Sequence, residues 1–152
     1  MKEKTSKPLL VWILIVLQLL LGVGAVASGA LLMASPDGSL MHMPLSVMKG
    51  APFSSFFIPG LILFLFVGIY PFGVAYGLWK QPGWTWPDAI NPFKQFHWSW
   101  AGSLAAAVIV ILWLSVELIW VPFMFLHTTY YTWAGLILII TLSPAVRRYS
   151  KK

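Results

Sequence analysis

The sequence predicts an all-α fold: a polytopic membrane protein in which four transmembrane helices form one bundle. Hydrophobic residues make up 59% of the 152 positions, charged residues make up 9%, and the mean hydropathy is +0.83. Soluble domains carry about a quarter charged residues, so this composition excludes a soluble monomer. Four apolar runs each reach the roughly 20 residues that a helix needs to cross a bilayer. Because these runs occupy most of the chain, we expect a single membrane domain over residues 1–152.

The four apolar runs predict four helices, over residues 8–33, 56–79, 98–121 and 123–142. Backbone N–H and C=O groups in lipid must be paired inside the protein, and a helix pairs them within one segment. One loop over residues 34–55 and another over residues 80–97 join the runs. The first run also ends in small residues, as a cleaved signal peptide does. Its apolar stretch is longer than such peptides use, so we expect a helix there.

Basic residues lie mostly on one side of the expected membrane. Three precede the first run, two lie in the loop over residues 80–97 and four follow the last run, against one in the loop over residues 34–55. Cytoplasmic loops carry the excess of Lys and Arg. Nine against one therefore predicts cytoplasmic N and C termini, an outward-facing loop over residues 34–55, and a multi-pass protein of the cell membrane. The residues counted are Lys2, Lys4, Lys7, Lys80, Lys94, Arg147, Arg148, Lys151 and Lys152 on one side and Lys49 on the other.

The net charge of +6 predicts contact with lipid rather than with nucleic acid. The basic residues flank the apolar runs, where they bind anionic lipid headgroups, and they form no basic face interleaved with aromatic residues. The chain contains no cysteine, which excludes disulfides and thiolate metal sites. We expect the lipid bilayer as the main partner and no cofactor.

Small residues spaced four apart predict close packing between helices. Lipid removes the hydrophobic drive between helices, so contacts at glycine, alanine and serine matter more. Such pairs fit either an internal seam or a contact with a second copy of the chain or a larger membrane complex. Gln18 predicts an interhelical hydrogen bond, and Pro71 predicts a kink midway along the second helix. The pairs are Gly24 with Ser28, Ala25 with Gly29, Gly73 with Gly77, Gly102 with Ala106, and Ser103 with Ala107.

Three sequence blocks mark the long loop and the start of the second helix. They are SPDGS at 35–39, GAPF at 50–53 and IPGLILF at 58–64. In this order the blocks resemble a mostly uncharacterised group of small bacterial four-helix integral membrane proteins. The resemblance covers residues 29–68. It implies a bacterial inner membrane and brings no activity or ligand with it.

The same loop holds methionines around a histidine: Met41, His42, Met43 and Met48. Thioether and imidazole groups suit Cu(I), so these four residues are the candidates for a metal site. Methionine is also a common apolar filler, and the cluster has neither a cysteine nor a second histidine. The apolar interpretation is therefore favoured, and we expect no metal.

One carboxylate lies inside an expected helix, and that is Glu117. Ionisable groups inside spans usually face the bundle interior or a cavity. His127 begins the fourth helix just across a short turn, and Tyr130 follows about one turn later. These three side chains, beneath the loop that carries Asp37 and His42, are the candidates for a ligand or proton site at the outer end. The interpretation favoured over it is a structural hydrogen bond that locks the third and fourth helices together.

The sequence carries no catalytic signature: HExxH, GxSxG, a phosphate-binding glycine loop and an Asp-rich metal motif are all missing. The favoured hypothesis is therefore a non-enzymatic accessory or structural membrane protein that acts through helix contacts. A second hypothesis is binding or transport of a small molecule, ion or lipid through an outward-facing pocket at Glu117 and His127. A third is a small lipid-modifying membrane enzyme in which the same pair acts as general acid and base.

Overall fold

A computed structural model of the protein describes residues 6–152. Residues 1–5, with the Lys2 and Lys4 of the charge count, lie outside the described residues. Over residues 6–152 the chain is helical, with no β-strand, and four of its helices are long and apolar enough to cross a membrane. The predicted all-α class with four such helices is confirmed.

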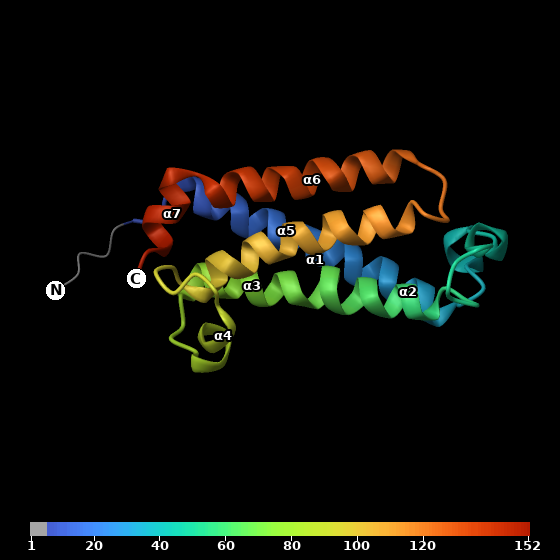
Figure 1. Ribbon diagram of the computed structural model, residues 1–152, viewed down its shortest axis with the longest axis horizontal. Coiled ribbons are helices and arrows are strands. Elements are labelled where there is room, and N and C mark those ends of the chain that lie inside the picture. Colours follow the sequence, from blue (N-terminus) through green and yellow to red (C-terminus); the bar gives the residue numbers. More distant parts are fainter. Residues whose placement is uncertain (1–5) are drawn as a thin grey trace.

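The four long helices lie side by side along the longest axis of the molecule (Figure 1). The first is α1 (Leu9–Ala34). The second consists of α2 (Phe57–Ile62), a π-helical segment (Leu63–Ile69) and α3 (Tyr70–Lys80), and we call it the 57–80 helix. The third and fourth are α5 (Trp98–Glu117) and α6 (Phe125–Leu142). Successive helices run in opposite directions, as in an up-and-down bundle (Figure 1).

The two ends of the bundle differ (Figure 1). The start of α1, the short helix α4 (Thr85–Ile90) and the C-terminal helix α7 (Pro144–Ser150) lie at one end, which we call the termini end. The opposite end carries the loop over residues 35–56, with two short 3-10 helices (Ser39–Met41 and Leu45–Met48), and the turn between α5 and α6. We call it the loop end.

The third helix is shorter than the sequence predicts, and it ends at Glu117 rather than at residue 121. The backbone N–H groups of Trp120 and Val121 both donate to the Glu117 carbonyl, at 3.0 and 2.8 Å, and close the last turn. Pro122 follows, and a proline disfavours helical geometry in the residue before it. The fourth helix starts at Phe125 instead of residue 123, because the chain is still in the turn at residues 123 and 124.

The chain re-enters a helix where the sequence analysis ended the last one. Ser143 caps α7, and its hydroxyl accepts a hydrogen bond from the Val146 N–H at 3.4 Å. Pro144 takes the first helical position, where its missing N–H is not needed. Helix α7 therefore turns the chain across the termini end (Figure 1).

Glycines bring α1 and the 57–80 helix close together. A Cβ atom on Gly29 would lie 2.6 Å from the carbonyl oxygen of Gly60, and one on Gly22 would lie 2.9 Å from that of Gly68. Gly73, in contrast, faces open space, while Gly77 packs against Trp98 inside the chain. The seam is thus internal, and of the predicted small residues only Gly29 takes part in this closest approach.

A chain of buried hydrogen bonds joins three helices nearer the termini end. Gln18 of α1 donates from Nε2 to the Ser103 hydroxyl of α5 at 3.0 Å, which confirms the predicted interhelical bond. The Ser103 hydroxyl lies 2.8 Å from that of Thr141 in α6, which in turn donates to the Ile137 carbonyl at 2.6 Å. Each hydroxyl therefore accepts one bond and donates the next, whereas the carboxamide oxygen of Gln18 is buried without a partner among the described residues.

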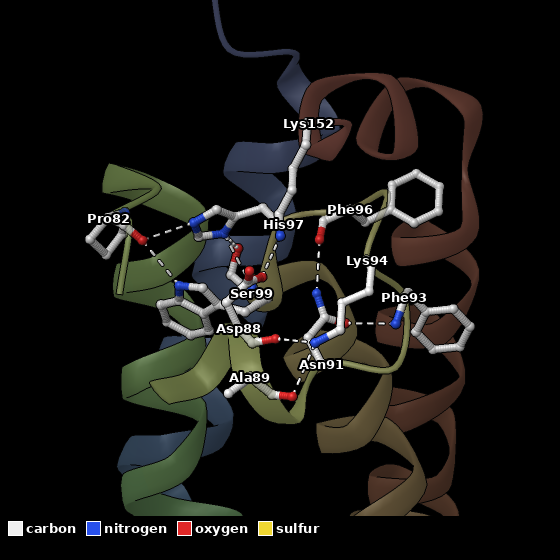
Figure 2. Close-up of polar contacts among 11 residues, drawn as sticks. Pro82, Asp88, Ala89, Asn91, Phe93, Lys94, Phe96, His97, Ser99 and Lys152 are labelled. Carbon is white, nitrogen blue, oxygen red and sulfur yellow. Dashed lines mark hydrogen bonds and ion pairs between the residues drawn. The ribbon is translucent and has the colours of Figure 1, made fainter. Parts of the chain in front are cut away.

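The C-terminal residues close the termini end against the segment before α5 (Figure 2). The His97 N–H donates to the Ser150 carbonyl at 2.7 Å, and the Lys152 N–H donates to the Gln95 carbonyl at 3.0 Å. The Lys152 ammonium also pairs with the Asp88 carboxylate, and this hydrogen-bonded pair holds the pKa of Asp88 below its ordinary value. We call these contacts the C-terminal clasp.

Candidate functional site

A pocket of about 310 Å³ opens at the loop end, among α1, the 57–80 helix, α5, α6 and the loop over residues 35–56. Ligand pockets in proteins span about 300–1,000 Å³, so this one is large enough for a small molecule. Most of its wall is apolar. The wall includes Leu32, Phe56, Leu63, Val67, Val110, Trp113, Leu114, Trp120 and Val121.

Helix α5 supplies one side of the pocket at helical spacing. Val110, Trp113 and Glu117 stand three and four residues apart, so they project from one face of the helix. Helix α6 supplies His127 and Tyr130, three residues apart, from across the turn. The short turn at Pro122 thus brings the carboxyl group and the imidazole to the same depth.

The imidazole of His127 is held in one tautomer. Its side chain is only 4% exposed. The backbone N–H of Met124, the residue that caps α6, donates to its Nδ1 at 3.1 Å. An imidazole nitrogen that accepts a hydrogen bond carries no proton, so in the neutral ring the proton is on Nε2. A doubly protonated ring would have to break the bond to Met124.

The Nε2–H group of His127 lies near Glu117 without bonding it. Nε2 lies 3.9 Å from Glu117 Oε2, which is beyond hydrogen-bond length. Nε2 is buried, and no other atom of the described chain accepts its proton. The Glu117 side chain remains 28% exposed. The pair is therefore a donor and a carboxyl group separated by a gap in the wall of an apolar pocket.

Three of the five residues predicted for the ligand site lie together. Glu117, His127 and Tyr130 all line the pocket, whereas Asp37 and His42 are not among its lining residues. The position of Asp37 has a local explanation, because its carboxylate accepts hydrogen bonds from the Ser35 hydroxyl and from the N–H and hydroxyl of Ser39. These bonds, led by that of Ser35, lower the pKa of Asp37 and fix the turn.

The methionine cluster of the loop is divided between the pocket and the surface. Met41, Met43 and Met48 line the pocket, and Met48 packs with Leu32 in a small apolar cluster. His42 is exposed and takes a left-handed backbone conformation, with φ of 53°. Across residues 6–152, no group of three or more His, Cys, Asp or Glu side chains is placed to hold a metal ion. The methionines act here as an apolar wall.

Met124 is the residue that the sequence analysis missed. It lines the pocket, and its N–H fixes the tautomer of His127. A side chain at the third helical position that bonds back to the capping residue is a known helix-start pattern. A histidine three residues after the capping residue could therefore have predicted this bond, but only if the sequence analysis had placed the start of the helix at Phe125.

Models of known families, curated proteins and solved structures were compared with the chain, and none of them matches it. The chemistry of the pocket is therefore the basis for a function. Its wall offers one buried N–H donor, one carboxyl group and a large apolar surface. This combination suits a molecule with an apolar body and a small polar head.

Proposed function

We propose that this protein is a membrane protein that binds a small, largely apolar molecule in the loop-end pocket, with the polar head of that molecule between Glu117 and His127. The buried Nε2–H of His127, which lacks an acceptor among the described residues, carries the proposal. An unpaired buried donor costs about 1–3 kcal/mol, and a ligand acceptor at this point removes the cost.

The outer surface of the bundle supports the membrane setting. Large apolar side chains are exposed on all four long helices, for example Leu20, Phe66, Leu112 and Ile139. Lipid solvates such a surface, whereas extended apolar surface in water promotes aggregation. The excess of basic residues toward the termini end favours a cytoplasmic position for that end. The pocket then lies near the outer surface of the cell membrane. The resemblance to bacterial proteins favours a bacterial inner membrane.

The tautomer of His127 disfavours a role as general base. Nδ1 is occupied by the Met124 N–H, and Nε2 already carries a proton, so neither nitrogen is free to accept one. A general base needs such a free nitrogen within reach of the proton that it removes. This argument removes His127 as the general base of a lipid-modifying enzyme and leaves that role to Glu117 alone.

The packing of Gly77 weakens the hypothesis of an accessory protein that acts through helix contacts. A Cβ on Gly77 would lie 2.4 Å from the Trp98 ring, so this glycine already has a partner within the chain. Of this predicted pair only Gly73 faces open space, so Gly73 and Gly77 do not form an outward seam together.

Filling the pocket tests the proposal. Leu63→Trp places a larger ring in the pocket wall, while Leu65→Trp puts the same ring on an exposed face of the same helix. We expect native mass spectrometry of gently extracted protein to find a bound small molecule on the wild type and on Leu65→Trp, and none on Leu63→Trp. A wild type without a bound small molecule, or equal retention by Leu63→Trp, contradicts the proposal.

A further inference from the structure

The hydrogen-bonding groups of the pocket also indicate which polar head it takes. We propose that the ligand is an apolar alcohol, whose hydroxyl group bridges His127 Nε2 and the Glu117 carboxyl. This inference rests on the proposed function, since it names the class of molecule that the same pocket binds.

The imidazole requires an acceptor. With Nδ1 occupied by Met124, His127 offers only the Nε2–H donor to the pocket. An ammonium head has three donors and no acceptor, so it would leave this N–H unpaired. Ammonium heads are therefore disfavoured, and uncharged heads with a lone pair, such as oxygen heads, are favoured.

Glu117 selects among the oxygen heads. A carboxylate head would set a second carboxyl group beside that of Glu117, where two like charges repel. An ether or ester oxygen accepts from His127 and can also accept from a protonated Glu117, but it has no proton to give to an ionised Glu117. A hydroxyl group donates and accepts at once, so it pairs with His127 and with Glu117 in either protonation state of the carboxyl.

The distance between the two groups fits a single bridging oxygen. His127 Nε2 and Glu117 Oε2 are 3.9 Å apart. An oxygen atom at about 2.8 Å from each completes both hydrogen bonds, with an angle of about 90° at that oxygen. A water molecule has the same two-way chemistry, but it leaves the apolar space lined by Leu32, Leu63 and Met48 unfilled.

Matched photoprobes test the head group. The probes share a ten-carbon chain with a central diazirine and end in a hydroxyl, a methyl ether, a carboxylate or an amine. Each is added to the full-length protein in lipid nanodiscs, and labelling of pocket residues is counted by peptide mass spectrometry. We expect about tenfold more pocket labelling by the alcohol than by the methyl ether, because only the alcohol donates a hydrogen bond to the Glu117 carboxylate.

A variant isolates the role of Glu117. Glu117→Leu removes the carboxyl group from a partly exposed position, and Val116→Leu is a matched change at the adjacent, exposed position. We expect the alcohol-to-ether ratio to fall to about one in Glu117→Leu and to remain at about ten in Val116→Leu.

The outcomes separate this inference from the proposed function. Equal labelling by all heads, or a preference for the acid or the amine, overturns the inference that the ligand is an alcohol. The pocket then remains a binding site if Leu63→Trp abolishes the labelling. Labelling of the pocket no greater than that of the outer surface, and unchanged in Leu63→Trp, overturns both and leaves water as the occupant.

Discussion

At the scale of single residues, His127 decides what the pocket can do. The short turn between two helices predicted that His127 and Glu117 reach a similar depth, but the sequence does not fix the rotation of the helices that brings the two side chains within 3.9 Å. The direction of the His127 proton was not predictable, because that depends on the backbone N–H of Met124, 3.1 Å from Nδ1. A sequence shows which residues are near a turn, but only a structure shows the hydrogen-bond geometry at the start of a helix.

Asp37 and His42 were expected at the site, but they are not among the residues that line the pocket. Both are polar residues in the loop that was expected to cover the site, and both were assigned to it. The carboxylate of Asp37 is bound within the block SPDGS, to Ser35 and Ser39. That block already had the composition of a tight turn, so the local role of Asp37 was readable from the sequence. The left-handed backbone of His42 was not.

His97 makes the termini end sensitive to acid. Its Nδ1 accepts from the Ser99 N–H at 3.3 Å, and its Nε2 lies 3.0 Å from the Pro82 carbonyl (Figure 2). Burial lowers the pKa of His97 from its ordinary value of 6.5. The unfolded chain therefore binds more protons, so this stabilisation is complete above about pH 6.5 and decreases as the pH falls toward the lower folded pKa.

We predict that His97→Asn removes this pH dependence. Asparagine keeps the helix cap but does not titrate. Thermal unfolding in detergent should show a lower Tm at pH 5.5 than at pH 7.5 for the wild type, and a smaller difference for His97→Asn. The ion pair of Asp88 with Lys152 does not interfere, because the pKa of Asp88 lies below 3.8. An equal decrease in both proteins would show that another group is responsible.

At the scale of elements, apolar runs predict the helices, and local chemistry sets their ends. Run length located four helices, and the structure has four of sufficient length. Pro122 shortens α5, and Ser143 with Pro144 starts α7, which the sequence analysis did not predict. Both are standard start and stop signals, so these errors came from giving hydropathy more weight than capping.

The Pro71 kink illustrates a different limit. The sequence predicted a kink there, because proline lacks an N–H and its ring crowds the carbonyl four residues earlier. The structure has a π-helical segment just before Pro71, in which the Tyr70 N–H donates to the Leu65 carbonyl five residues back. A wider turn is one way in which a helix adapts its hydrogen bonds around an interruption. Sequence alone does not select among such adaptations.

We predict that the contact between α1 and the 57–80 helix depends on Gly29. A Cβ at this position meets the Gly60 carbonyl at 2.6 Å, and backbone atoms cannot move aside easily. Gly29→Ala should therefore lower the free energy of unfolding by about 1–3 kcal/mol. Gly73→Ala is the matched control, because it faces open space and gains up to about 1 kcal/mol of helix propensity. Unfolding by SDS titration measures both, and an equal effect of the two variants would refute the contact.

At the scale of the whole molecule, the two ends of the bundle have different tasks. The chain of hydrogen bonds from Gln18 to Thr141 and the C-terminal clasp fix the helices nearer the termini end. The loop end instead holds the apolar pocket and its unpaired imidazole. The proposed binding function fits this division, because a fixed half holds the walls of the pocket in place.

The central claim is that the gap between Glu117 and His127 is filled by the head of an apolar ligand. Its most direct test is an experimental structure of the protein extracted from its own membrane into nanodiscs. We predict elongated non-protein density in the pocket, ending within hydrogen-bond distance of His127 Nε2. A pocket without such density, in which Glu117 and His127 bond directly to each other, would contradict the claim.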